Sequence, residues 1–215
     1  MARPKTPILS KPAIRAAALA LIDRDGLEKL SMRKLAQELD VRAASLYSHY
    51  GNKDELLTDV SEEVTSDIDV TGFAEDWREG LTRWARSYRD ALTRHPNLLP
   101  VTAAGPGRRE EALRRADAVH GGLVGAGWPP KQATMIGASA KYLVVGAATQ
   151  SFARGFEDDV RIYRDRYPNL TQAHRLPEHA AEIDDASFEL ALTAFLDGLE
   201  ALFATVTQAE STGDA

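Results

Sequence analysis

Residues 30–57 carry the side chains whose types and spacing best suit recognition of nucleic acid. The stretch reads LSMRKLAQELDVRAASLYSHYGNKDELL and includes Arg33, Arg42 and Lys53. Cationic side chains attract phosphate groups, and arginine can also reach the edges of bases. The chemistry that these residue types favour is therefore non-covalent binding of a polyanion rather than a covalent reaction.

Two short helices must position these side chains. The first is predicted to begin after Ser31, because serine caps helix N-termini. Its apolar face consists of Leu35, Ala36 and Leu39. Asp40 is expected in the turn that follows, since aspartate tolerates a positive φ angle. The second pattern holds Leu46 and Tyr50 four positions apart and ends at Gly51. Two helices joined by such a tight turn suit insertion of the second into the major groove of DNA.

The side chains left on the outer surface of the second helix and its flanks form the predicted interface. They are Arg42, Ala43, Ala44, Ser45, Tyr47, Ser48 and His49. Small Ala43 and Ala44 let the helix approach base edges and contact a thymine methyl group. The typical partners of phosphate are Tyr47, His49 and Lys53. Arg33 can reach a base or a phosphate, and we expect Arg33 and Arg42 to supply most of the base discrimination. The alternative, that this shape is only a structural corner, stays open.

The spacing of apolar residues predicts an all-α chain. Besides the two short helices and one that starts at Lys53, helices are expected at about 11–25, 77–94, 109–125, 131–154 and 185–207. Residues 156–184 are polar and are predicted to form a long loop. No segment shows the alternation of a β-strand. We predict an N-terminal three-helix DNA-binding domain at 1–56, with the helix-turn-helix at about 32–51, and a larger helical domain at 57–215.

The distribution of charge favours a nucleic-acid partner, although the 215-residue chain has a net charge of −6. Residues 1–53 hold 10 Lys and Arg against 5 Asp and Glu, whereas the remainder holds 16 against 27. A basic segment on an acidic chain concentrates the attraction for phosphates in one place. The absence of cysteine excludes disulfides and thiolate chemistry. No apolar run is long enough for a membrane span, so we expect a cytoplasmic protein with no membrane partner.

Residues 30–57 also resemble the TetR family of bacterial transcriptional regulators. The resemblance rests on RKLAQ at 33–37, LYSH at 46–49 and NK at 52–53. It extends more weakly over 77–206, where the segment SYRDALTRHPNLLPV and the last helix look like the regulatory domain of the tetracycline-repressor-like subgroup. The resemblance implies a homodimeric repressor. Its N-terminal domain would bind double-stranded operator DNA, and its C-terminal domain would bind a small-molecule effector that releases the operator.

The family pattern, carried over position by position, implies a set of residues that face DNA. They are Met32, Arg33, Ala43, Ala44, Ser45, Tyr47, Ser48, His49 and Lys53. The chain departs from the pattern at Asp40, where the turn usually has glycine. It departs again at Ala43 and Ala44, which replace larger or polar readers. The operator sequence therefore cannot be taken from relatives.

An effector site is expected among the helices of residues 77–154, where an apolar cavity with a few polar groups would bind a small molecule. The candidate residues are Trp84, Tyr88, Leu99, His120, Met135, Tyr142 and Gln150. Each of them also suits a plain helical core. Tetracycline-binding members of the family hold a metal–drug complex through histidines. The matching segment 100–107 has Thr102 and no histidine, with His95 nearby. Because one histidine makes a poor metal site, we expect no metal and no other cofactor.

The helices at 131–154 and 185–207 are the expected dimer interface. Small residues on the first permit close packing, and the apolar stripe on the second exceeds what one partner helix would cover. Two other classes of function stay open. An all-α enzyme would need a nucleophile with its base or a metal cluster, but His174 and His179 have no clear partner. A protein-interaction module that has lost DNA binding would not need the cationic helix-turn-helix residues.

Overall fold

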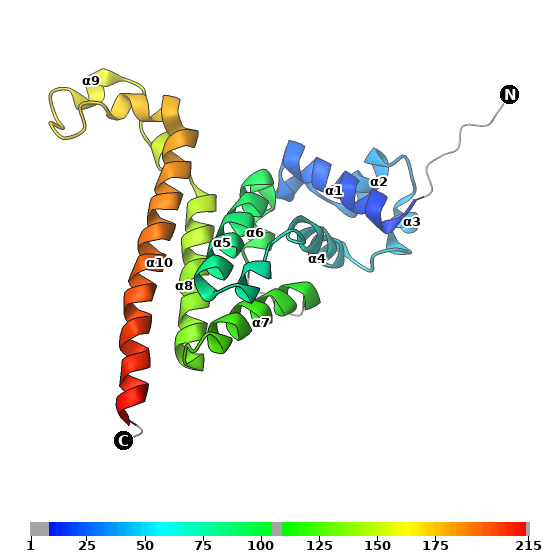
Figure 1. Ribbon diagram of the computed structural model, residues 1–215. Helices are drawn as coiled ribbons and strands as arrows, with labels where there is room; N and C mark the ends of the chain where they lie inside the picture. Colours follow the sequence, from blue (N-terminus) through cyan, green and yellow to red (C-terminus); the bar gives the residue numbers. More distant parts are fainter. Residues whose placement is uncertain (1–8, 105–108, 214–215) are drawn as a thin grey trace. The chain divides into compact units, whose positions relative to one another are not determined.

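The computed structural model describes residues 9–104 and 109–213, with side chains as far as residue 206. These residues form helices joined by turns, and no β-strand occurs among them (Figure 1). The predicted all-α class is therefore confirmed. None of the described helices is both long enough and apolar enough to cross a membrane.

The chain divides into two compact units. The first unit consists of Met1–Asp67 and Ala91–Leu113, and the second of Ile68–Asp90 and Arg114–Ala215. Each unit consists of two separate segments of the chain. This division therefore does not test the prediction that one boundary in the sequence separates the two domains. The domain boundary at residue 56 stays a prediction.

Five short elements form the N-terminal part of the first unit. They are α1 (Lys11–Asp25), the 3-10 turn η1 (Leu27–Lys29), α2 (Met32–Glu38), α3 (Ala43–Tyr47) and α4 (Lys53–Val64). Three helices begin at the predicted caps. The side chains of Ser10, Ser31 and Asn52 each accept a hydrogen bond from the backbone N–H three residues later. Each bond satisfies a donor that the helix leaves without an internal partner, and so fixes where the helix starts.

The four helices bury one shared apolar core. Its buried members are Ile14, Ala18, Leu21, Ile22, Leu30, Met32, Leu35, Ala36, Leu46, Tyr50, Leu56, Leu57, Val60, Val64 and Leu98. Leu98 belongs to η3 (Pro96–Leu98), which leads into α6 (Leu99–Thr102). The helix-turn-helix is thus held by a core to which a much later part of the chain contributes.

Asp40 occupies the turn between α2 and α3 with a φ angle of 52°. This value lies in the left-handed region, which the sequence predicts for this position. A side chain with a Cβ atom is strained there, although aspartate tolerates the region better than most residues. The backbone N–H of Val41 then donates to the carbonyl of Ala36 at 2.9 Å and closes the turn.

We expect substitutions at Asp40 to separate the backbone requirement from the chemistry of the side chain. Asp40→Gly should leave the free energy of unfolding unchanged or slightly raised, because glycine adopts positive φ without strain. Asp40→Ala should lower it by about 1 kcal/mol. Urea denaturation followed by circular dichroism measures both. Equal stability of the two variants would show that the turn does not hold a positive φ.

The second unit contains the longer helices. Its elements are η2 (Thr71–Ala74), most of α5 (Trp77–Arg94) and α7 (Glu110–Gly125), α8 (Pro130–Thr149), η4 (Ala153–Gly155), α9 (Val160–Tyr163), η5 (Ala173–His179) and α10 (Ala180–Gly213). α8 ends five residues before the predicted limit, and α10 begins five residues earlier than predicted. The last residues of α5 and the first of α7 belong to the first unit.

The prediction of a long loop at 156–184 is wrong, because α9, η5 and the start of α10 lie there. Local contacts explain the difference. Asp159 caps α9 by accepting from the N–H of Arg161 at 2.9 Å. Aromatic rings spaced along the segment also pack in sequence, from Phe152 through Phe156 and Tyr163 to Tyr167. These elements are too short to show the periodic spacing of apolar residues by which helices are recognised in a sequence.

Aromatic side chains fill the space between the helices of the second unit. Trp128 is fully buried, and its ring meets Trp77 edge-on at 5.6 Å and Phe203 at 4.8 Å between centroids. The Phe73 ring occupies the space that a Cβ atom at Gly80 or Gly122 would need. These contacts tie η2, α5, α7 and α10 together.

Charged side chains link α5 to α10 as well. Arg86 forms a paired contact with Glu189, and Arg89 contacts Asp185 at 2.7 Å. Arg78 contacts both Asp197 and Glu200. Residues further along α5 pair with residues nearer the start of α10, so the pairs fix an antiparallel register between the two helices. Each exposed pair by itself adds little to stability.

Candidate nucleic-acid interface

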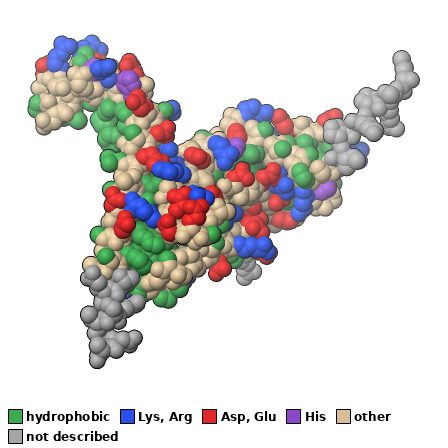
Figure 2. All heavy atoms as spheres, viewed as in Figure 1, with side chains coloured by type: hydrophobic (Ala, Val, Ile, Leu, Met, Phe, Trp, Pro, Cys, Tyr) green, Lys and Arg blue, Asp and Glu red, His purple; other side chains and the backbone are tan. Residues whose placement is uncertain are grey.

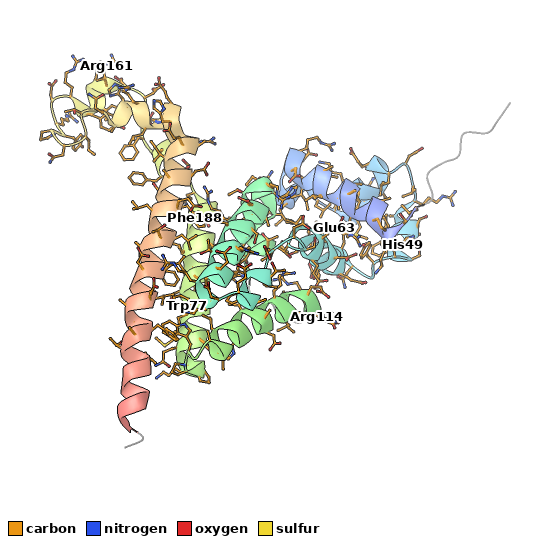
Figure 3. The ribbon with its side chains drawn as sticks, viewed as in Figure 1. His49, Glu63, Trp77, Arg114, Arg161 and Phe188 are labelled. Carbon is orange, nitrogen blue, oxygen red and sulfur yellow. The ribbon has the colours of Figure 1, made fainter. Side chains whose placement is uncertain are left out.

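The outer face of α3 is the side opposite the residues that it buries in the core. Leu46 is fully buried and Tyr50 is 1% exposed, so both side chains anchor the helix to the core. On the opposite side Ala44, Tyr47 and Ser48 are exposed. The half-buried residues are Ala43, Ser45 and His49. Figure 3 labels His49, which lies in the helix-turn-helix part of the first unit.

Met32 does not lie on this outer face. The resemblance placed it among the DNA-facing residues, but its side chain is buried in the core of the first unit. Met32 is the first residue of α2 and follows the Ser31 cap, and this position turns its side chain inward beside Leu35. We therefore remove the Met32 side chain from the candidate interface.

Most cationic side chains around α1 and α2 already have partners. Arg24 contacts Glu38 through both carboxylate oxygens and also contacts Asp25. Lys34 contacts Asp25 at 2.6 Å. The hydrogen bonds from Arg24 and Lys34 lower the pKa of Asp25 to about 2. This network joins α1 to α2 and neutralises the charges that take part in it.

A second network joins α1, α4 and the end of the helix-turn-helix. Asp59 accepts hydrogen bonds from the buried Tyr50 hydroxyl and from Arg15, which also contacts Glu63 (Figure 3). Burial, together with the bond to Asp59, raises the pKa of Tyr50. Burial alone would raise the pKa of Asp59, but the bonds from Tyr50 and Arg15 outweigh it and lower that pKa. The ammonium group of Lys11 lies 4.8 Å from the centre of the Tyr50 ring.

A few cations remain without such contacts. In residues 9–67, Lys29, Arg33 and Arg42 are exposed, and their side chains form no ion pair or hydrogen bond with the described part of the chain. Lys53 is half buried, and its ammonium group lies 3.5 Å from the carbonyl oxygen of Leu27. Arg33, Arg42 and Lys53 therefore keep hydrogen-bonding capacity for a ligand.

The segment 91–113 completes the first unit. Asn97 donates from its amide to the carbonyl oxygens of Ile22 and Asp23, both at 3.0 Å, and so caps the C-terminal end of α1. His95 contacts Asp23 at 2.9 Å. Thr102 is buried and donates to the carbonyl of Leu98 at 3.2 Å. The predicted effector residues His95 and Thr102 thus have structural roles beside α1 and in the core.

The nine predicted effector residues do not all lie in one unit. Those in the first unit are His95, Leu99 and Thr102, and those in the second are Trp84, Tyr88, His120, Met135, Tyr142 and Gln150. Trp84 and Tyr88 are buried, and their rings meet edge-on at 5.4 Å. His120 is half buried, 3.3 Å from the carbonyl oxygen of Pro130. Met135 and Tyr142 are instead exposed on α8, and Gln150, the residue directly after this helix, is exposed as well.

α8 and α10 pack against each other and present exposed apolar side chains. Tyr142 is 75% exposed and Met135, on the same face of α8, is 58% exposed. Leu190 of α10 is 73% exposed. Figure 2 shows hydrophobic side chains gathered over these two helices. Because monomeric proteins seldom leave large apolar patches in water, this surface is suited to contact with another protein chain.

The described residues contain no cluster of three or more His, Cys, Asp and Glu side chains that could hold a metal ion. The outer face of the helix-turn-helix presents hydroxyl groups, small side chains and cations. Such an array can bind a polyanion without any metal ligand among its residues.

Two family models match the chain. Residues 14–60 match the model described as bacterial regulatory proteins, tetR family. Residues 73–203 match the model described as tetracyclin repressor-like, C-terminal domain. The first match contains α2 and α3, and the second contains α5 to α9 and much of α10.

Characterised relatives are similar over most of the chain. An HTH-type transcriptional regulator from Saccharopolyspora erythraea is 30% identical over 154 residues, which cover 71% of this chain and 65% of that protein. This chain thus matches slightly less than two thirds of that relative's length. The class A tetracycline repressor from transposon 1721 of Escherichia coli is 31% identical over 194 residues, which cover 85% of this chain and 87% of that protein.

Solved structures share the fold. A possible TetR family transcriptional regulator from Streptomyces coelicolor A3(2) superposes with a TM-score of 0.71 at 30% identity, over 90% of this chain and all of that one. ActR from Streptomyces coelicolor, in complex with actinorhodin, gives 0.68 at 29%, over 90% and 97%. BioQ with its natural double-stranded DNA operator gives 0.63 at 25%, over 90% and 99%.

Proposed function

We propose that this chain, which belongs to the tetR family of bacterial regulatory proteins, is a homodimeric repressor that a small molecule releases from its operator. The proposal that the chain binds DNA rests on the outer face of the helix-turn-helix. Arg33, Arg42 and Lys53 keep hydrogen-bonding capacity there, whereas Arg15, Arg24 and Lys34 are engaged in ion pairs. Its family consists of transcriptional regulators rather than enzymes. We propose that it acts in the cytoplasm, because a regulator of this kind must reach the bacterial chromosome.

The proposed DNA contacts follow from exposure and chemistry. The side chains assigned to phosphates, which position the protein on the duplex, are Tyr47 at the end of α3 and His49 and Lys53 beyond it. Arg33 lies on α2 and reaches a phosphate or a base. The residues assigned to the bases are Ala43, Ala44 and Ser45 of α3, Arg42 directly before the helix and Ser48 directly after it.

The dimer is proposed to form through the exposed faces of α8 and α10. A Cβ atom added at Gly146 or Gly198 would meet no other group of the described chain within 4 Å, so partner helices can approach closely there. Together with Tyr142 and Leu190, these positions favour a four-helix interface around a two-fold axis. Binding to two half-sites one turn of DNA apart would require the two copies of α3 to lie about 34–36 Å apart.

The effector is proposed to bind within the second unit. The edge-on pair of Trp84 and Tyr88 offers aromatic surface, and His120 offers a polar group close to the start of α8. ActR, a structural relative, is known in complex with actinorhodin. An effector would act by binding more tightly to a conformation whose two recognition helices do not match the operator spacing.

We expect salt-dependent binding to the DNA upstream of the protein's own gene. Fluorescence polarisation of a labelled duplex, measured from low to moderate salt, should give a steep negative slope of log affinity against log salt. Lys53→Ala should weaken binding and reduce that slope by about 1, because one phosphate contact is lost. Lys29→Ala removes an exposed charge that is not among the proposed DNA contacts and serves as the matched control.

Two outcomes would contradict the proposal. One is binding with no salt dependence and no difference between Lys53→Ala and Lys29→Ala. The other is the absence of binding to any duplex tested by a protein that is folded and dimeric.

A further inference from the structure

The recognition helix α3 offers unusually little hydrogen-bonding capacity. Ala43 and Ala44 present only methyl groups. The Ser48 hydroxyl donates to the carbonyl oxygen of Ser45 at 2.7 Å, so its proton is already used. The Ser45 hydroxyl can pair with more than one base and does not separate them. The remaining exposed polar side chain of α3 is Tyr47, which is assigned to a phosphate. The residues of α3 that are assigned to the bases therefore cannot specify a base strongly.

Arg42 supplies what α3 lacks. It directly precedes α3 as its N-cap residue, with φ −77° and ψ 142°, and its side chain does not cap the helix. The side chain is exposed and forms no ion pair or hydrogen bond with the described residues. The nearby Glu38 does not compete for it, because Arg24 contacts both Glu38 oxygens. The guanidinium fork is thus available at the end of the helix that enters the groove first.

We propose that Arg42 determines one position of the operator sequence, by forming paired hydrogen bonds to O6 and N7 of a guanine in each half-site. The inference rests on the proposed function and deepens it by naming a feature of the DNA. Arginine matches the two adjacent acceptors of guanine, which no other base presents in the major groove. Ala44, on the outermost side of α3, contacts the methyl group of a thymine beside that guanine.

Arg42 is assigned to a base rather than to phosphate because of its position relative to α3. Tyr47 lies at the C-terminal end of α3 and Lys53 begins α4, and both are assigned to the DNA backbone. Arg42 adjoins the residues whose side chains are too short to exclude it from the floor of the groove. Two neighbouring alanines leave room for the long arginine side chain to lie along the base edges.

The experiment begins with selection of bound duplexes from a library of random 30-base-pair DNA by the full-length protein. Wild type, Arg42→Lys and Arg42→Ala are selected in parallel. Wild type should enrich an inverted repeat with a guanine at one fixed place in each half-site. Both variants should lose the preference for guanine at that place and keep their base preferences at the other positions. Arg42→Lys should lose it although lysine retains the positive charge, because lysine lacks the planar guanidinium with its two parallel donors. Replacing that guanine should weaken wild-type binding by about 5- to 100-fold.

Modified bases then test individual atoms on the enriched duplex. 7-Deazaguanine at the chosen place removes the N7 acceptor and should weaken binding by wild type but not by Arg42→Ala. Deoxyuridine in place of the neighbouring thymine removes one methyl group and should weaken binding by about 4-fold. The Ala44→Gly variant should not distinguish thymine from uracil. Circular dichroism shows that each variant is folded, and Arg42 is exposed, so its replacement leaves the core intact.

The outcomes separate this inference from the proposed function. An enriched inverted repeat whose specificity does not change in either Arg42 variant overturns the inference and leaves the function standing. Uniformly weaker binding by Arg42→Ala, with a smaller salt slope and full recovery in Arg42→Lys, makes Arg42 a phosphate contact and also overturns it. Failure of folded wild-type protein to enrich any duplex overturns both.

Discussion

Tyr142→Asp combined with Leu190→Asp is expected to convert the protein into a monomer and to weaken binding to a full operator by about 100-fold or more. Tyr142 and Leu190 are the most exposed large apolar side chains of α8 and α10. A buried carboxylate without a partner opposes association strongly. Loss of the dimer removes the gain from binding two half-sites at once, which is on the order of 10²- to 10⁴-fold.

Sedimentation velocity measures the change in mass, and polarisation with an inverted-repeat duplex measures the affinity. The matched control is Val124→Asp, which places a carboxylate on the exposed surface of α7 in the same unit. That variant should remain a dimer with unchanged affinity. A double variant of α8 and α10 that still sediments as a dimer would place the interface elsewhere.

Leu98→Ala is expected to destabilise the first unit by about 2–5 kcal/mol, the usual cost of shortening a fully buried leucine. Leu98 is 0% exposed and lies in the same core as Leu46 and Leu56. The large effect is notable because Leu98 falls within the region that matches the C-terminal domain model, residues 73–203. The variant should therefore weaken the helix-turn-helix from a distant place in the sequence.

Hydrogen exchange read by mass spectrometry distinguishes the two units. Amides of α1 and α4 should exchange roughly 30-fold faster or more in Leu98→Ala, because opening of the first unit becomes easier. Tryptophan fluorescence should change little, since Trp77, Trp84 and Trp128 all lie in the second unit. Leu113→Ala, at an exposed position of the first unit, is the control. Equal exchange in both variants would show that the core does not depend on Leu98.

Local signals in the sequence sufficed for the N-terminal helices. Ser10, Ser31 and Asn52 cap helices as expected, and Asp40 holds the positive φ predicted for the turn. These features depend on contacts within about four residues, so residue type and spacing determine them. Residues 156–184 lacked such a signal, because their short elements depend on packing between aromatic rings.

The direction of individual apolar side chains was less predictable. Met32 was assigned outward by its place in a family pattern, yet it is buried. Met135 and Tyr142 were assigned to a cavity by residue type, yet they are exposed on α8. The sequence marks a side chain as apolar, but the same apolar character suits a core, a cavity and a surface between two chains.

The sequence by itself determined the helical class, the caps and turn of the helix-turn-helix, and the cationic residue types around α3. The tertiary structure decided which of those cations remain available, because ion pairs such as Arg15 with Asp59 and Arg24 with Glu38 join residues far apart in the chain. It also decided that Leu98 and Asn97 belong with α1. Local structure follows from residues that are neighbours in the sequence. Whether a charged side chain remains unpaired, and whether a residue belongs to a core, depend on which distant residues the fold places next to it.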